Sequence, residues 1–492
     1  MHECALRNKP FDSPHLTQQS TPSLSTPTPR RWLILLAMTG SLSMIFVDIT
    51  VTAVAGPAIS NDFHIDANGA NWIANAYLIA LAALMAIGGR VGDMMGKRSA
   101  FTTGVILFAA ASALCAIADN FQFLLVGRVL QGVGAALMQP ASASIVIDSF
   151  APGERGKAMG IYIGIPMTFF ALGPVIGGLV TEHLGWRYVF SINLPIALAA
   201  LLLTLYARPA NQKNADRSFD ILSALLLVVG LPLFIVALQD GSHPDADGAQ
   251  RIFSLPYIIA LLGGVALCGV FVRRQFRLAR PLIALSLFHD RALLADALLI
   301  GIMQFAMAGI IVEGSIYAQD VLHFTPSQAG ASLMPMLVPV IFLAQVAGRQ
   351  YDRRGVRPLA RIGTPLATMG FVVWSAGCVF EQYPVIAVGM VFLGAGVACI
   401  MSPANTDALS RAPDNMRGQV SGVMQTFRQV GGAVGVAFAA CVVEVVRATG
   451  QPLSVAIGAA MLGGACVAAM GCVVALKMPS REMVKLSPTP LR

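Results

Sequence analysis

Apolar segments of about 20 residues recur along almost the whole chain, from Trp32 to Leu476. A helix rises about 1.5 Å per residue, so each segment is long enough to cross a hydrocarbon layer about 30 Å thick. Only 12% of the 492 residues are charged, whereas a soluble domain carries roughly 25%. The pattern therefore predicts an all-α integral membrane protein and excludes a soluble fold.

We expect fourteen membrane-spanning helices. Their approximate ranges are 32–57, 70–89, 99–118, 122–147, 157–180, 187–207, 219–239, 253–272, 292–317, 328–348, 359–380, 383–406, 419–446 and 453–476. Most basic residues fall on the loops of one side, and the opposite side has only Arg187, Arg251 and Arg447. Because cytoplasmic loops are enriched in Lys and Arg, we expect both termini in the cytoplasm. This distribution accounts for the net charge of +8 without a nucleic-acid partner.

The two ends of the chain lack long apolar segments. Residues 1–29 are rich in Ser, Thr and Pro and have no apolar centre like that of a signal peptide, so we expect a disordered cytoplasmic tail that is not cleaved. Residues 479–492 are expected to form a second cytoplasmic tail. The eight cysteines are scattered without a CxxC pair, so we expect no disulfide framework, no metal site and no cofactor.

One motif occurs twice. The pattern GxxxDxxG covers Gly89–Gly96 and returns 259 residues later at Gly348–Gly355, and several Gly and Arg-Gly pairs follow at nearly the same spacing. This spacing equals eight of the predicted spans, so the two copies have the same orientation, as in parallel repeats. We therefore expect an N-terminal six-helix half at 30–208, an inserted two-helix segment at 209–280 and a C-terminal six-helix half at 281–478.

Four segments carry further recognisable patterns: Asp48–Thr50 with Pro57 beyond it, GRVGDMMGKR at 89–98, RVLQGVG at 128–134 and GPVIGG at 173–178. Together they resemble the major facilitator superfamily, specifically its fourteen-helix branch of drug:proton antiporters, over nearly the whole chain after the N-terminal tail. The resemblance implies two six-helix halves plus an inserted helix pair, and its fifth-helix motif implies export. Ala53 and Gly56 depart from the first-helix signature of that branch. These two departures leave the resemblance to the family intact, but the substrate contacts of the branch are not carried over to this part of the helix.

Asp48 lies about 16 residues into the first span, past the middle of the membrane. A charged group at such depth costs about 2.5 to 3.5 kcal/mol and usually faces a cavity or a partner. Asp48 is therefore either a proton carrier, since a low-polarity setting stabilises a neutral carboxyl group, or the acceptor of a helix-packing hydrogen bond from Ser or Thr.

Arg128 and Glu313 are the other residues that we assign to proton coupling. Arg128 either pairs with an acid or holds a hydrogen-bond network that responds to protonation of Asp48. Its match to the fourth-helix arginine of the superfamily implies a coupling role. Glu313 is nearer the outer side, where it serves as a second proton site, as a contact for cationic substrates or as a residue of the outer vestibule.

The remaining charged residues of the spans are assigned simpler roles. Arg428, the other basic residue inside a span, is expected to act in packing or gating. The acids near span ends, where we expect solvated or snorkelling side chains, are Asp148, Asp296, Asp407 and Glu444.

The repeated motif predicts a gate on the cytoplasmic side. Its residues are Gly89, Asp93, Gly96, Lys97 and Arg98 in the first copy and Asp352 in the second. The glycines permit close approach and a tight turn, the aspartate can cap or face the positive end of a neighbouring helix, and the cations hold the cytoplasmic side. A topology signal alone would explain the cations but not an aspartate between spaced glycines.

The antiporter motif of the fifth span combines small residues with a proline. Gly173, Gly177 and Gly178 offer a smooth face to a neighbouring helix, and Pro174 lacks an N–H group and is expected to kink its own helix. The motif either seals a cytoplasm-facing cavity against proton leak or serves packing alone.

These expectations describe a proton-coupled secondary transporter rather than an enzyme or a channel. The sequence has no nucleophile with a base, no HExxH motif and no Walker A loop. We expect export of small, hydrophobic drugs or toxic metabolites by alternating access in a bacterial cytoplasmic membrane, with protons, the substrate and the lipid bilayer as partners. A narrow-substrate exporter, a proton-coupled importer of a metabolite and a sensor on the same fold stay open as alternatives, as does the oligomeric state.

Overall fold

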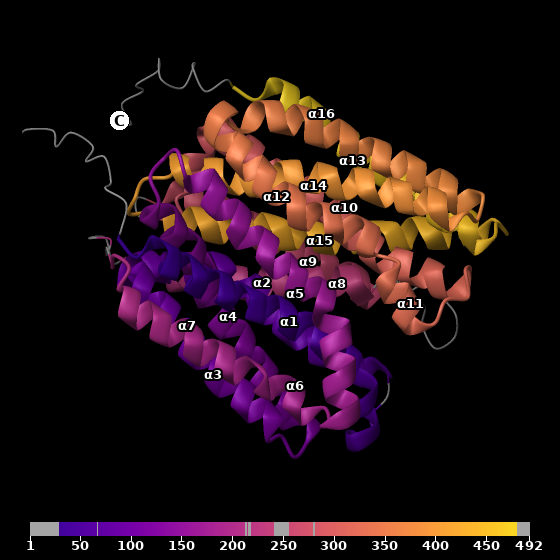
Figure 1. Ribbon diagram of the computed structural model, residues 1–492, viewed down its shortest axis with the longest axis horizontal. Helices are drawn as coiled ribbons and strands as arrows, with labels where there is room; N and C mark the ends of the chain where they lie inside the picture. The colour runs from indigo at the N-terminus through magenta and orange to yellow at the C-terminus, as the bar shows by residue number, and fades with distance from the viewer. Residues whose placement is uncertain are drawn as a thin grey trace, which may run out of the picture.

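The computed structural model describes residues 29–65, 67–211, 214, 218–240, 255–278 and 281–479. Within these ranges the chain is helical and has no strand, and fourteen of its helical segments are long and apolar enough to cross a membrane (Figure 1). The predicted all-α membrane fold is therefore confirmed. Nearly all of the first predicted tail, and the second from residue 480 onward, lie outside the described residues.

The first six spans are built from seven helices, because one span is divided into two consecutive helices. They are α1 (Arg31–Phe63), α2 (Ala67–Met95), α3 (Lys97–Ala116), α4 (Phe121–Ser149), α5 (Arg155–His183), α6 (Arg187–Ser191) and α7 (Asn193–Ala207). The inserted pair is α8 (Ile221–Asp240) and α9 (Leu255–Arg277).

The last six spans form the second half. Its helices are η2 (Leu285–His289), α10 (Arg291–Asp320), α11 (Pro326–Ala331), α12 (Met334–Arg354), α13 (Val356–Val379), α14 (Tyr383–Arg411), α15 (Arg417–Ala448) and α16 (Leu453–Lys477). The short α11 leads into α12, and the two together form one span. Figure 1 shows the second half, in orange and yellow, lying beside the indigo and purple first half.

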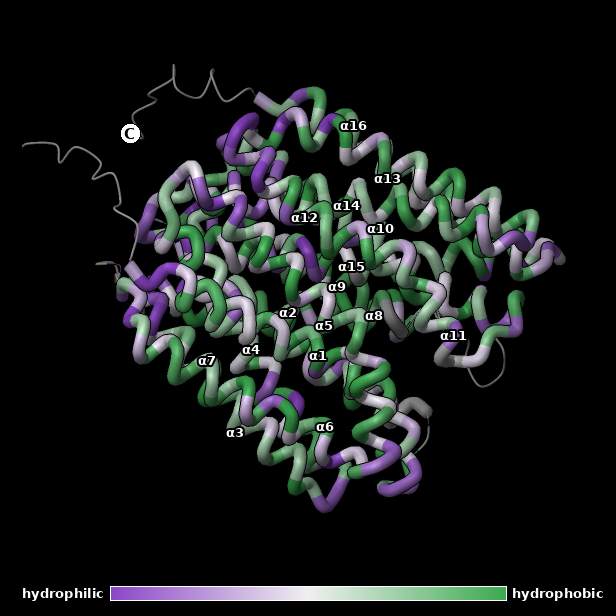
Figure 2. Tube along the Cα trace, viewed as in Figure 1, coloured by the Kyte–Doolittle hydropathy of each residue, from purple (hydrophilic) through white to green (hydrophobic). Residues whose placement is uncertain are grey.

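Two helix pairs form the main contacts between the halves. On one side α2 packs against α15, and on the other α5 packs against α12. Since α12 repeats α2 and α15 repeats α5, the two contacts are related by the internal repeat. Figure 2 shows hydrophobic residues along the helices and hydrophilic residues gathered toward the ends of the bundle, as a protein that spans a bilayer requires.

The inserted helices lie at the edge of the bundle. They pack against each other, and α8 also contacts α2 and α15, whereas the further contact of α9 is with η2. Only 11% of the most apolar part of α9 is buried inside the protein. An apolar helix that is so exposed to its surroundings is stable in lipid, so we place the pair on the outside of the two-half core.

The first copy of the repeated motif lies at a helix junction rather than in a loop. The span predicted to end at residue 89 continues as helix α2 to Met95, so Gly89 and Asp93 are helical residues. Gly96 separates α2 from α3 with φ of 97°, a conformation that favours glycine. Gly355 separates α12 from α13 at the equivalent point with φ of 77°.

Candidate functional site

Asp48 lies on α1 inside the N-terminal half and is 1% exposed. Its Oδ2 accepts a hydrogen bond of 2.6 Å from Arg128 Nη1 on α4. Its Oδ1 accepts hydrogen bonds from Asn193 Nδ2 on α7, at 2.8 Å, and from Gln131 Nε2 on α4, at 3.2 Å. The donors of Asp48 are thus an arginine and two amides, and not the Ser or Thr hydroxyl considered from the sequence.

Arg128 is as deeply buried as its partner. Its Nη1 also donates to Gln131 Oε1 at 2.7 Å, and its Nε donates to the Ile73 carbonyl at 2.9 Å. The guanidinium carbon lies 4.6 Å from the centre of the Tyr77 ring. A buried ion pair is tolerated when its remaining hydrogen-bonding groups are satisfied, and it becomes costly when one partner is neutralised. We call Asp48, Arg128, Gln131, Asn193 and Ser112 the Asp48 network.

Three members of the Asp48 network have no role assigned from the sequence. Gln131 lies one turn after Arg128, so both side chains share a face of α4. Asn193 begins α7, and its amide also donates to Ser112 Oγ at 3.3 Å. Ser112 Oγ accepts a second bond, of 2.7 Å, from Gln131 Nε2. The signal that could have found Gln131 and Asn193 is a polar amide inside an otherwise apolar span.

Glu313 is not part of this network. It lies on α10 in the C-terminal half, is 3% exposed and makes no hydrogen bond or ion pair with a residue that the structure describes. The structure therefore separates Glu313 from Asp48 and Arg128, and its three proposed roles stay predictions.

The aspartate in each copy of the repeated motif accepts hydrogen bonds from the first turn of a helix in the opposite half. Asp93 at the end of α2 accepts hydrogen bonds from the backbone N–H groups of Gly418, at 2.9 Å, and Gln419, at 2.8 Å, in the first turn of α15. The first N–H groups of a helix have no partner within the helix and carry the positive end of its dipole. Asp93 thus faces the positive end of a neighbouring helix, and its role in a gate stays a prediction.

The second copy makes the same contact with the halves exchanged. Asp352 at the end of α12 accepts hydrogen bonds from the N–H groups of Gly156, at 2.8 Å, and Lys157, at 2.9 Å, at the start of α5. We call the Asp93 contact and the Asp352 contact the two latches, and the end of the bundle where they lie the latch end.

Each latch requires glycine on both helices. A Cβ atom added to Gly89 would lie 2.1 Å from the carbonyl oxygen of Gly418, and one added to Gly348 would lie 2.1 Å from that of Gly156. Since real Cβ atoms do not approach that closely, any side chain at these positions would push the two halves apart.

The two cations of the motif differ in their surroundings. Lys97 is 1% exposed, and its Nζ donates to Asp148 Oδ2 at 2.6 Å and to the Asp414 carbonyl at 2.8 Å. Asp148 is also paired with Arg417, at the start of α15. The solvated position predicted for Asp148 is therefore wrong, because it joins cations of both halves. Arg98 is partly buried and has no ion pair with a described residue.

The antiporter motif packs α5 against the part of α1 that carries Asp48. A Cβ atom added to Gly173 would lie 1.7 Å from Thr50 Oγ1, and one added to Gly177 would lie 3.0 Å from Val51 Cα. Thr50 and Val51 follow Asp48 by two and three residues, so these glycines position the turn next to the acid.

Gly178 differs from expectation, whereas the kink expected at Pro174 stays a prediction. A Cβ atom added to Gly178 would meet nothing within 4 Å, so Gly178 is not part of the packing face. Pro174 lies on the exposed side of α5, which runs as one helix through Pro166 and Pro174 from Arg155 to His183.

Arg428 connects the two halves near the middle of the bundle. Its Nε donates to Gln304 Oε1 of α10 at 3.0 Å, and its guanidinium carbon lies 5.5 Å from the centre of the Phe46 ring of α1. Phe46 precedes Asp48 by two residues. The packing role expected for Arg428 therefore has a definite place, at a contact between α15 and the helix of the proton-site candidate.

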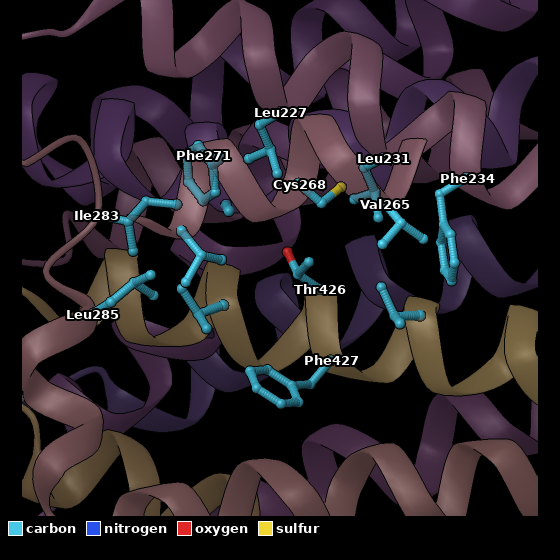
Figure 3. A pocket seen from close by; sticks show the side chains of 14 residues that line it. Leu227, Leu231, Phe234, Val265, Cys268, Phe271, Ile283, Leu285, Thr426 and Phe427 are labelled. Carbon is cyan, nitrogen blue, oxygen red and sulfur yellow. The ribbon is translucent and has the colours of Figure 1, made fainter. Parts of the chain in front are cut away.

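An apolar cavity of about 330 Å³ lies between the inserted pair and the core (Figure 3). Leu231 of α8, Phe271 of α9 and Phe427 of α15 are among its lining residues, and Thr426 directs a hydroxyl group toward it. None of the residues assigned to proton coupling or to the latches lines this cavity. It is therefore separate from the Asp48 network.

Residues 36–436 match the sequence profile of the Major Facilitator Superfamily. The chain is 33% identical over 409 residues to the tetracenomycin C resistance and export protein of Streptomyces glaucescens, covering 83% of this chain and 75% of that protein. It is 30% identical over 420 residues to the drug efflux pump JefA of Mycobacterium tuberculosis, covering 85% and 81% of the two chains. The chain therefore belongs to the Major Facilitator Superfamily, a family of membrane transporters, as the sequence motifs indicated.

Solved structures support the same fold. The proton:xylose symporter XylE bound to 6-bromo-6-deoxy-D-glucose superposes with a TM-score of 0.65 at 14% identity, covering 92% of this chain and 97% of that one. The human organic anion transporter MFSD10 superposes with a TM-score of 0.63 at 15% identity, covering 91% and 99%. At such identities the likeness concerns the fold alone.

Proposed function

We propose that the protein is a proton-coupled exporter of small hydrophobic drugs or toxic metabolites and works by alternating access. The observation that carries the proposal is the buried Asp48–Arg128 ion pair inside the first half of a two-half transporter fold. The names of the relatives, a resistance and export protein and a drug efflux pump, support export as the direction. The basic loops support a bacterial cytoplasmic membrane with both termini in the cytoplasm.

The proton acts on the Asp48 network. Protonation from the outside neutralises Asp48 and leaves the guanidinium of Arg128 without its counter-ion in a buried site, which is unfavourable. Arg128 then relaxes toward its remaining partners, Gln131 and the Ile73 carbonyl. Deprotonation toward the cytoplasm restores the pair and resets the carrier.

Helix α5 links the proton site to a latch. Gly173 and Gly177 hold α5 against α1 beside Asp48, while Gly156 and Lys157 at the start of the same helix hold Asp352. A shift of α1 on protonation is therefore passed along α5 to the other half. Both latches are closed in this structure, and we assign it to the state that is closed to the cytoplasm.

The driving force is adequate for uphill export. A membrane potential of 100 mV contributes about 2.3 kcal/mol for each elementary charge that crosses the membrane. One inward proton thus supports an outward gradient of more than about tenfold for a neutral substrate. A hydrophobic substrate agrees with the few acidic groups in the described spans.

Efflux of a lipophilic cationic dye and of a neutral hydrophobic dye from energised cells tests the proposal. Wild type, Asp48→Asn and the control Asp119→Asn, which changes an exposed acid outside the spans, are compared with and without a protonophore. We expect protonophore-sensitive efflux of at least one dye in wild type and the control, and its loss in Asp48→Asn. Equal protonophore-sensitive efflux by wild type and both variants would overturn the role of Asp48. Accumulation of a dye inside the cells would favour an importer.

A further inference from the structure

Asp296 is a buried acid that plays no part in the Asp48 network or the latches. It lies on α10, one and a half turns after the helix begins at Arg291, and it is 0% exposed. Neither of its carboxylate oxygens receives a hydrogen bond from a residue that the structure describes. The solvated side chain expected near this span end is therefore wrong for Asp296.

Four groups from α12, α14 and the start of α10 interact electrostatically with Asp296, and two of them are carboxyl groups. They are Asp407 and Arg411 of α14, Tyr351 of α12 and Asp290, which precedes α10. Asp407 accepts a hydrogen bond of 3.0 Å from Tyr351 Oη and is paired with Arg411. Arg411 in turn lies 3.9 Å from Asp290. Arg411 is thus paired with two carboxyl groups, and its closest contact is with Asp407.

Two neighbouring buried carboxylates cannot both be ionised without a large cost. An ionised carboxylate has acceptors only, so Asp296 and Asp407 cannot form a hydrogen bond to each other unless one of them carries a proton. A proton on Asp296 provides the missing donor and removes one negative charge from a site that holds a single arginine. An unpaired ionised carboxylate at this depth would be costly, so the complete burial of Asp296 and its lack of a hydrogen-bond donor favour a bound proton.

We propose that Asp296 and Asp407 share one proton and form a second proton-binding site, in the C-terminal half and separate from Asp48. The site belongs to this half alone, because the internal repeat places Ala37 at the position equivalent to Asp296. The bound proton is inferred from the burial of Asp296 and from its lack of a hydrogen-bond donor, whereas a role for this proton in transport rests on the proposed function.

The pair lies next to the second latch. Tyr351, which donates to Asp407, directly precedes Asp352, which holds the start of α5. Loss of the shared proton leaves two adjacent negative charges between α10 and α14 and pulls on Arg411 and Tyr351. We therefore expect release of this proton to loosen α12 at the latch end, which the charge pattern places in the cytoplasm.

Infrared spectroscopy of the purified protein in lipid nanodiscs tests the site directly. A protonated carboxyl group has a C=O stretching band that ionised carboxylates lack, and this band shifts in deuterated water. We compare wild type, Asp296→Asn, Asp407→Asn and the exposed-acid control Asp119→Asn across neutral pH. The Asn side chain at 296 can donate to Asp407 as the shared proton does, so Asp296→Asn is expected to fold.

We expect the C=O band to lose the intensity of one carboxyl group in Asp296→Asn and in Asp407→Asn. In Asp119→Asn the band should keep its full intensity. Identical band intensity in wild type and Asp296→Asn would overturn the proposal, and Asp407→Asn repeats the test should the first variant fold poorly. Asp48→Asn distinguishes the two proposals. If it keeps this intensity of the band while transport is unaffected, the proposed function fails and the second site stands.

Discussion

At the scale of single residues, the Asp48 network owes its properties to burial. Asp48 and Arg128 neutralise each other in a region that excludes water, and two amides and a ring complete their surroundings. The loss of stability when either residue is replaced should therefore come mainly from the unpaired charge of the remaining partner, and less from the lost contact itself. Removing one partner of a buried pair typically costs about 3 to 5 kcal/mol.

Arg128→Gln should lower the free energy of unfolding by up to about this amount, because Asp48 loses its counter-ion and must either stay charged in a buried site or take up a proton. The double variant Asp48→Asn/Arg128→Gln should recover most of the loss, because it leaves no charge. Thermal unfolding of the purified proteins in detergent measures both effects. A double variant at least as unstable as the sum of the two single variants would contradict this account.

The Asp220–Arg274 pair of the inserted helices gives a pH dependence. Asp220 lies just before α8. A hydrogen bond from Arg274, which is the main cause, and a second from Ser223 lower the pKa of Asp220 from 3.8 to about 2. Because the folded pKa is below the unfolded one, the pair's contribution to stability is full above about pH 5 and is lost as the pH falls from about 4 toward 2.

The difference in Tm between wild type and Asp220→Asn should therefore be constant between about pH 8 and 5 and shrink at lower pH. Since the pair is partly exposed, the difference should be small and weaker in high salt. A difference that grows on acidification would show that another group is responsible.

At the scale of helices, the latches depend on backbone approach between α2 and α15 and between α5 and α12. The carboxylates supply the attraction, and the glycines set the distance at which it operates. A change at a latch glycine should therefore affect the equilibrium between closed and open states more than it affects the fold of either half.

Gly89→Ala should favour the state with open latches, because its Cβ would overlap the Gly418 carbonyl. Spin labels can be attached at the exposed residues Arg208 and Arg354, which lie at the latch end, one in each half. Pulsed electron paramagnetic resonance then measures the distance between the two labels. We expect longer distances in Gly89→Ala than in the matched control Gly178→Ala, where a Cβ meets nothing within 4 Å. Identical distance distributions in the two variants would argue against the latch as a gate.

At the scale of the whole molecule, the even number of spans among the described residues agrees with our proposal that both ends of the chain lie on one side of the membrane, and the basic loops favour the cytoplasm as that side. Fluorescent-protein fusions at both termini should therefore be bright in bacterial cells. An alkaline phosphatase fusion after Asp119, in the loop between α3 and α4, should be active because that enzyme requires the outside. An inactive phosphatase at this site combined with dark terminal fusions would reverse the assigned orientation.

Much of this architecture could be predicted from the sequence because its causes are local. Long apolar segments indicate the spans, and the spaced glycines around Asp93 and Asp352 indicate the latches without any knowledge of neighbours. Asn193 was missed and Asp296 was misassigned for the opposite reason. Their environments are set by residues from other helices, and distance from a span end does not predict burial when helices pack around that end.

The two latches have the symmetry of a homodimer contact within a single chain. In a two-fold dimer, each subunit offers the same patch, so every contact occurs twice with the roles exchanged. Here Gly89 and Asp93 meet the start of α15 while Gly348 and Asp352 meet the start of α5. The halves therefore act on each other as equivalent partners. A rotation of one half about an axis at the opposite end of the bundle would lengthen both contacts together, so we expect the two latches to open in a single cooperative step.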